Sequence, residues 1–319
     1  MRRYKKIWLS VLWVSLPFII GCVVLFAMPY DKRFGYYFAK YNCMQQSGLI
    51  YDRIFLNDKP ADLAFFGTSH TIDGICDYRM EDSLRELGLP LHVLTLGYCR
   101  LGRNAPYVIL KDLLKFKQPQ CIVIEVTEKE NRDGHMDFAY LADTKDVLFP
   151  ELIFNDNIFQ DWFKALVVRF ESKKRKLFGQ YDLPPVNKVN YGHREDWSII
   201  NKDELKRQQE NKLKNYKYTT GFARWFYNKY SFNYIKEMVK MAKDRGIKVV
   251  FLYTPEIASV SLPEELEFYK QFGDVLIPPD EIYQNPQYWK DVKHMNDHGA
   301  YAMAGWLSRS LAPYLKPPN

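Results

Sequence analysis

The sequence lacks the features that mark zinc-binding and nucleotide-binding proteins. It has only five cysteines and six histidines in 319 residues, and no C-x-x-C pair or His/Cys spacing typical of a metal site occurs. No G-x-G-x-x-G follows the first predicted strand, and no P-loop is present. There is also no internal repeat and no low-complexity segment. We therefore expect neither a metal nor a nucleotide cofactor.

Charge is missing from one long segment near the N-terminus. Residues 7–28 are 22 residues without a charged side chain, and about 20 apolar residues are enough to cross a bilayer as a helix. Arg2, Arg3, Lys5 and Lys6 precede the segment, and a smaller positive excess follows it. The positive-inside rule then places the N-terminus in the cytoplasm and the following chain outside, in the periplasm or an equivalent compartment.

Cys22 leaves a second interpretation of this segment open. The stretch FIIGC at 18–22 resembles a lipoprotein cleavage box, with Cys22 as the lipidated residue. The apolar run continues beyond Cys22, however, whereas a mature lipoprotein usually turns polar there, so an uncleaved anchor is favoured. Both alternatives tether the rest of the chain to a membrane.

The other four cysteines would lie outside the membrane, in a compartment that permits disulfides. They are Cys43, Cys76, Cys99 and Cys121. Four cysteines allow three pairings, and the sequence does not choose among them. We expect them instead to be small buried residues, especially Cys121 at the start of a predicted strand.

Short apolar runs alternate with amphipathic helical segments along most of the remaining chain. This alternation predicts βαβ units and a mostly parallel sheet, and hence an α/β domain. The apolar run CIVIEV is typical of a strand buried on both faces. Strands are predicted at 61–66, 91–97, 121–126, 247–255 and 274–279. Helices are predicted at 77–88, 105–116, 231–246, 263–273 and 296–315.

These patterns divide the chain into three parts. Residues 1–30 form a cytoplasmic tail and a transmembrane anchor, and residues 31–60 form a linker with a short helix. Residues 61–319 form the α/β domain, in which a helical, basic and aromatic insertion at about 151–230 interrupts the alternation.

Most of the net positive charge lies inside this insertion. The chain has a formal net charge of +7, and Arg169 to Lys217 contains 13 Lys/Arg against 7 Asp/Glu. Such a stretch is typical of a solvated face. The alternatives are a lid or a surface that contacts an anionic polymer or lipid head groups. A basic stretch can also indicate nucleic acid, but the membrane anchor argues against that partner.

A serine on a glycine turn follows the first predicted strand. Gly67, Thr68 and Ser69 come directly after the apolar run, and in open α/β sheets sites form outside the carboxyl ends of the strands. Ser69 is either a helix N-cap or a nucleophile. A nucleophilic serine needs a base, and the base needs a third group to fix its tautomer. Asp291 and His294 have D-x-x-H spacing just before the last helix, at the sheet edge expected for Ser69.

Together these motifs resemble the SGNH/GDSL hydrolase superfamily, in which a serine follows the first strand and Asp-x-x-His precedes the C-terminal helix. The resemblance covers Gly67 to Ser69, Asp291 to Gly299 and the strand spacing between them. It implies a three-layer, flavodoxin-like α/β/α domain without a cofactor. It also implies a catalytic triad of Ser69 as nucleophile, His294 as base and Asp291 as the carboxylate that orients the base.

The family's oxyanion hole uses the serine N–H, a glycine N–H after the second strand and usually an asparagine after the third. Ser69 and Gly97 match the first two positions. The stretch IEVTEKENRDG lacks the family's Gly-x-Asn-Asp motif, and Asn131 is its nearest asparagine. Glu128 is closer to the strand but accepts hydrogen bonds when ionised. Membrane-tethered branches that transfer acyl groups to cell-surface polymers depart from the family pattern in this way.

The resemblance implies an esterase or O-acyltransferase acting on acyl esters of cell-envelope glycans or glycolipids, with a multi-span membrane protein as a further partner. The alternative is a non-catalytic protein of the same fold that binds an envelope polymer or a membrane partner. His70 adjoins Ser69 in sequence, so its side chain is expected to point elsewhere. His298 is expected to cap a helix or face solvent.

Overall fold

The computed structural model describes residues 2–39, 44–127, 130, 132–183, 191–215, 220–257 and 262–317. At its centre lies a five-stranded sheet with the order β2-β1-β3-β4-β5, in which every pair is parallel. The strands are β1 (Leu63–Phe66), β2 (Val93–Thr95), β3 (Cys121–Val126), β4 (Lys248–Tyr253) and β5 (Asp274–Leu276). The predicted α/β class with a parallel sheet is confirmed.

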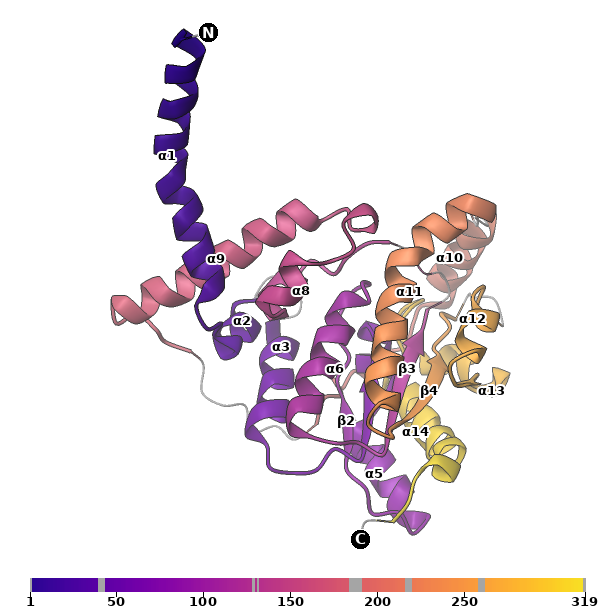
Figure 1. The fold of residues 1–319 in the computed structure, drawn as a ribbon. Helices are drawn as coiled ribbons and strands as arrows, with labels where there is room; N and C mark the ends of the chain where they lie inside the picture. Colours follow the sequence, from indigo (N-terminus) through magenta and orange to yellow (C-terminus); the bar gives the residue numbers. More distant parts are fainter. Residues whose placement is uncertain are drawn as a thin grey trace.

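Helices cover both faces of this sheet (Figure 1). Side chains alternate along each strand, so Ala64 and Phe66 of β1 enter one core while Leu63 and Phe65 enter the other. The first core is shared with α6 (Asn104–Phe116) and α11 (Gly221–Lys243), and the second with α5 (Asp77–Glu86) and α14 (Asp297–Leu311).

The strand order fixes where a site is expected. The chain passes from β1 outward to β2, and then returns to the other side of β1 as β3. Ligands of open α/β sheets bind at such a reversal, outside the carboxyl ends of the strands. Residues that directly follow β1 and β3 therefore occupy the favoured position, and the short helix α4 (Ser69–Gly74) is one of these segments.

The predicted apolar helix is also present. Helix α1 (Arg2–Ala27) contains a stretch, Trp8–Ala27, that is long and apolar enough to cross a membrane. Most of this stretch is exposed, and Figure 1 shows the helix projecting away from the α/β domain. Only its end contacts the domain, where the half-buried Phe26 packs against the first core. Its direction across a membrane remains a prediction.

The segment at 31–60, where a linker with a short helix was expected, contains three helices among its described residues. It forms α2 (Lys32–Phe38), α3 (Met44–Tyr51) and the π-helix η1 (Asp52–Leu56). Each of the three contributes a side chain to the core next to α6, namely Tyr36, Ile50 and Ile54. These helices lie between α1 and β1 and pack onto the domain.

The described residues of 151–230 are largely helical. The short helices α7 (Phe138–Leu141), α8 (Thr144–Leu148) and η2 (Leu152–Phe154) lead into the long helix α9 (Ile158–Leu177). Helix α10 (Lys202–Asn215) follows, and α11 starts ten residues before its predicted beginning at 231. The remaining helices are α12 (Leu266–Lys270), α13 (Asp280–Tyr283), η3 (Pro286–Tyr288) and η4 (Ala312–Tyr314).

The expectation of unpaired buried cysteines is correct for two positions and wrong for one. Cys76 and Cys121 are buried free thiols, and Cys22 is free within α1. Cys99 is disulfide-bonded and lies in a half-buried loop after β2. Cys43 lies outside the described residues.

Candidate active site

Ser69 is the first residue of α4, at the carboxyl end of β1. The N-cap of this helix is Thr68, whose extended backbone lets its side chain accept a hydrogen bond from the N–H of His70 at 3.2 Å. The capping role that competed with catalysis in the sequence therefore belongs to Thr68. The Oγ atom of Ser69 instead lies 2.8 Å from Nε2 of His294.

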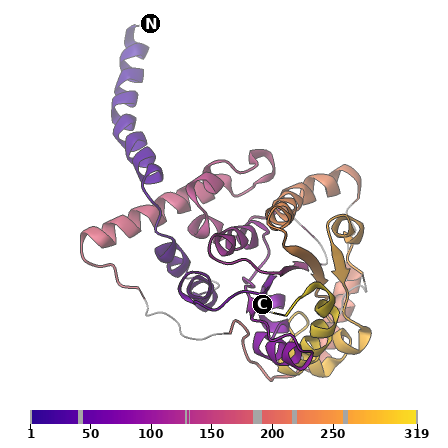
Figure 2. The same ribbon diagram turned by 60° about the horizontal axis from the view of Figure 1, so that its bottom comes forward.

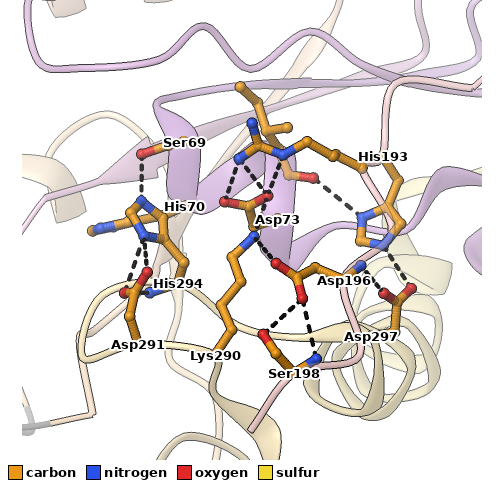
Figure 3. Close-up of polar contacts among 12 residues, drawn as sticks. Ser69, His70, Asp73, His193, Asp196, Ser198, Lys290, Asp291, His294 and Asp297 are labelled. Carbon is orange, nitrogen blue, oxygen red and sulfur yellow. Dashed lines mark hydrogen bonds and ion pairs between the residues drawn. The ribbon is translucent and has the colours of Figure 1, made fainter. Parts of the chain in front are cut away.

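His294 connects Ser69 to Asp291. Its Nδ1 atom lies 2.9 Å from Oδ2 and 3.1 Å from Oδ1 of Asp291, on the side of the ring opposite Ser69 (Figure 3). An Nδ1–H bonded to a carboxylate leaves Nε2 free to accept the proton of a hydroxyl. The three side chains thus form one continuous line of hydrogen bonds from a hydroxyl to a carboxylate.

A tight loop between η3 and α14 holds Asp291 and His294 in place. Trp289 and Met295 form an antiparallel bridge across it, and the N–H of Lys290 donates to the carbonyl of His294 at 3.1 Å. The indole of Trp289 is buried and donates to the carbonyl of Tyr283. Asn296 then caps α14 by accepting from the N–H of Gly299. The D-x-x-H spacing therefore lies on a loop anchored at both ends.

Asp291 is held in its ionised form. Partial burial opposes ionisation, but the hydrogen bonds from the His294 side chain and the Lys293 N–H outweigh it and lower the pKa of Asp291 to about 2. An ordinary aspartate ionises near pH 4. The Asp291 carboxyl group is therefore already fully ionised at the pH where an ordinary aspartate is only half ionised. A negative charge at this position would stabilise a positively charged His294 imidazolium.

A buried glutamate supports the turn that carries Ser69. Glu125 near the end of β3 is 1% exposed, and it accepts hydrogen bonds from the N–H and Oγ1 of Thr68 at 2.7 and 2.8 Å. Oγ1 of Thr71 donates to the same carboxylate at 2.5 Å. A Cβ atom at Gly67 would lie 2.2 Å from this carboxylate, so only glycine fits there. Glu125 thereby holds Thr68 before Ser69 and Thr71 after it.

Of the two remaining predicted oxyanion residues, the structure describes Gly97 but not Asn131. Gly97 packs directly against the Ser69 turn, since a Cβ atom there would lie 2.9 Å from the carbonyl of Thr68 and 3.0 Å from the N–H of Ile72. Its role as an oxyanion donor remains a prediction. Asn131 and Glu128 lie outside the described residues, so the third donor position is also still a prediction.

A charged cluster lies beside the triad (Figure 3). Buried Asp73 of α4 forms ion pairs with Arg194 at 3.0 Å and with Lys290 at 3.1 Å. Lys290 also lies 3.6 Å from the carboxylate of Asp196. Next to it, His193 bridges the carbonyl of Ile72 at 3.1 Å and the carboxylate of Asp297 at 3.0 Å. These contacts fasten the segment 191–198 to α4 and to the start of α14.

Two further histidines, His70 and His298, do not join the triad. The Nδ1 atom of His70 lies 3.8 Å from Glu125, and its ring lies edge-on to that of His294. His298 is exposed in the first turn of α14 and packs against Trp197, which agrees with its expected surface position. Among the described residues, no group of three His, Cys, Asp or Glu side chains could hold a metal ion.

Compared with known proteins, the chain matches no family model and no curated protein. Its function is therefore inferred from the geometry around Ser69 and from the motifs that surround it.

Proposed function

We propose that the protein is a membrane-anchored serine esterase or O-acyltransferase of the SGNH type, acting on acyl esters of cell-envelope glycans or glycolipids. The proposal depends on one observation, the line of hydrogen bonds from Ser69 through His294 to Asp291. A serine, a histidine and an aspartate in this order are the parts needed to make and resolve an acyl ester.

The reaction has two halves. His294 takes the proton of Ser69 while Oγ attacks the carbonyl carbon of the acyl ester, and the N–H groups of Ser69 and Gly97 are proposed to stabilise the oxyanion. The leaving alkoxide then receives the proton from His294, which leaves an acyl group on Ser69. In the second half His294 deprotonates water or a sugar hydroxyl, and this oxygen attacks the acyl-serine and restores the free enzyme.

The proposal includes the three-layer SGNH-like architecture and the orientation in the membrane. Helices on both faces of a parallel sheet support the first, and the basic residues before α1 support the second. The α/β domain would then lie on the extracytoplasmic side. A multi-span membrane partner would supply acyl groups to that side.

A second candidate is a non-catalytic protein of the same fold that binds an envelope polymer or a membrane partner. The observation that favours it is the missing Gly-x-Asn-Asp motif after β3. Loss of one oxyanion donor typically lowers the rate by about a hundredfold or more, so a protein without this donor would be a poor hydrolase.

Turnover of nitrophenyl acetate by the full-length protein in detergent distinguishes the two candidates. The esterase predicts hydrolysis that falls about a thousandfold or more in Ser69→Ala and is unchanged in Ser83→Ala, a matched serine on α5 away from the site. Acetylation of an added polysaccharide would identify a transferase. Equal rates for the unsubstituted protein and Ser69→Ala would contradict both enzymatic activities and favour the binding protein.

A further inference from the structure

Helix α9 has its apolar side turned away from the domain. Phe159, Phe163, Phe170 and Leu177 are 77, 68, 53 and 80% exposed. Their spacing of four, seven and seven residues places them on one side of the helix. The residues that α9 buries against the domain, among them Ala165, Val168 and Ser172, lie on the other side. Large apolar side chains in such an exposed row mark a contact surface.

This helix lies at the foot of α1. The guanidinium of Arg169 lies 5.2 Å from the ring of Phe26 and 4.1 Å from that of Tyr30. Lys173 donates to the carbonyl of Pro29 at 3.3 Å. Figures 1 and 2 show α9 lying crosswise at the domain end of α1. The exposed row is therefore fixed at the level where the apolar helix ends.

The charges on α9 suit an anionic membrane surface. The helix carries six basic and two acidic side chains, and Lys174, Arg175 and Lys176 fall in its last turn. Helices with aromatic and leucine side chains on one side and lysines and arginines on the flanks lie in the plane of the bilayer surface. Basic residues close to anionic head groups strengthen such binding.

The apolar surface continues toward the edge that holds Ser69. Helix α11 precedes β4, so it begins at the carboxyl edge of the parallel sheet, and its first turns expose Phe222 and Trp225. Phe154, shortly before α9, packs against Trp225 with ring centres 5.8 Å apart. The start of α11 and helix α9 lie on the side of the domain from which α1 projects (Figure 1).

We propose that α9 is seated in the head-group region of the bilayer that α1 crosses, with Phe159, Phe163, Phe170 and Leu177 inserted. The occupant is assigned as lipid because the surface is continuous with the membrane-spanning candidate and has basic flanks. Lipid contact does not depend on catalysis. If α9 is seated in this way, acyl esters would reach Ser69 from molecules held in the membrane. This consequence rests on the proposed function.

Spin labels on the full chain test this assignment. Phe163→Cys and Leu177→Cys place a label on α9, and Leu87→Cys places one at the far end of α5, on a leucine that is also exposed. The proteins are reconstituted in vesicles of phosphatidylethanolamine and phosphatidylglycerol. Collisions with oxygen, which concentrates in lipid, and with a water-soluble nickel chelate are measured. The unsubstituted protein gives the background from the native thiols.

We expect the labels at 163 and 177 to respond to oxygen more than to nickel, and the label at 87 to respond in the opposite way. Equal nickel access at all three positions would overturn the proposal. Protection in native membranes but nickel access in pure lipid vesicles would also overturn it, since a protein would then cover α9. Repeating the labels on a Ser69→Ala background keeps this result separate from any failure of the catalytic proposal.

Discussion

At the scale of single residues, the site consists of a short hydrogen-bonded line on a rigid support. Ser69 begins a helix that Thr68 caps, and His294 and Asp291 lie on a loop bridged at Trp289 and Met295. His294 can act as a base only if Ser69 is present to be deprotonated, so the two residues are expected to work together.

The first prediction is that Ser69 and His294 act as one unit. His294→Ala should lower the turnover of nitrophenyl acetate by about a thousandfold or more, and adding Ser69→Ala should lower it little further, because residues of one catalytic unit are strongly non-additive. Asp291→Asn should be milder than His294→Ala, because the base remains. If the two single losses multiply in the double variant, the residues do not cooperate in catalysis.

The second prediction concerns Glu125, which contacts the Ser69 turn but not the proposed reacting atoms. Glu125→Gln replaces one acceptor oxygen by a donor and should disturb the bonds to Thr68 and Thr71. Displacement of a catalytic group by about 1 Å can cost about a hundredfold. We expect a kcat that is about ten- to a hundredfold lower, with KM nearly unchanged. Exposed Glu267→Gln is the control, and an unaltered kcat in folded Glu125→Gln would contradict the positioning role.

The sequence indicated the triad residues but not their support. Ser69 could be recognised from its glycine turn after a strand, and Asp291 and His294 from their spacing, because these are local patterns. The contacts of Glu125 and His193 join residues 54 or more apart in the chain, and no local pattern reports them. The one feature of the sequence that pointed to this support is Glu125 itself, an acidic residue inside the apolar run CIVIEV.

At the scale of elements, strands were easier to predict than the segment that leads into them. The bounds of β3 agree with the sequence, since the central strand is apolar from end to end apart from Glu125. The segment 31–60 lacks such a run, and its helices are stabilised by contacts with distant parts of the domain. Its Arg53 is buried and binds Asp77 of α5 at 2.8 Å and the carbonyl of Thr95 at 2.8 Å.

The third prediction is that the Arg53–Asp77 ion pair stabilises the packing of residues 31–60 on the α/β domain. Arg53→Met leaves the buried carboxylate of Asp77 without its cation, and breaking a buried pair typically costs about 3–5 kcal/mol. The free energy of unfolding, measured by denaturant titration of the full chain in detergent, should fall by about that amount. Lys59→Met, an exposed change in the same segment, should be nearly neutral. Equal unfolding midpoints for the two variants would identify 31–60 as a dispensable linker.

At the scale of the whole molecule, the apolar helix α1 and the exposed apolar row of helix α9 lie on the same side of the α/β domain. The sequence alone could predict the first two, because they depend on composition and periodicity. The side of the domain from which α1 projects depends on contacts such as those of Arg169 with Tyr30, and these follow only from the folded structure.

The fourth prediction is that the α/β domain faces the extracytoplasmic side. Four basic residues precede the apolar segment, and positive charge is retained in the cytoplasm. Protease added to intact spheroplasts should digest the domain, while a cytoplasmic marker protein stays intact. Protection of the domain until the cells are lysed would reverse the orientation and move the site away from the cell envelope.

The most direct test of the central claim is covalent labelling of the full-length protein with a fluorophosphonate, followed by location of the modified residue by mass spectrometry. Such reagents react with a serine that a neighbouring base has activated. We predict one modified residue, Ser69, with labelling abolished in Ser69→Ala and strongly slowed in His294→Ala. A folded protein that stays unlabelled, or that carries the label on another residue, would contradict the assignment of Ser69 as the nucleophile.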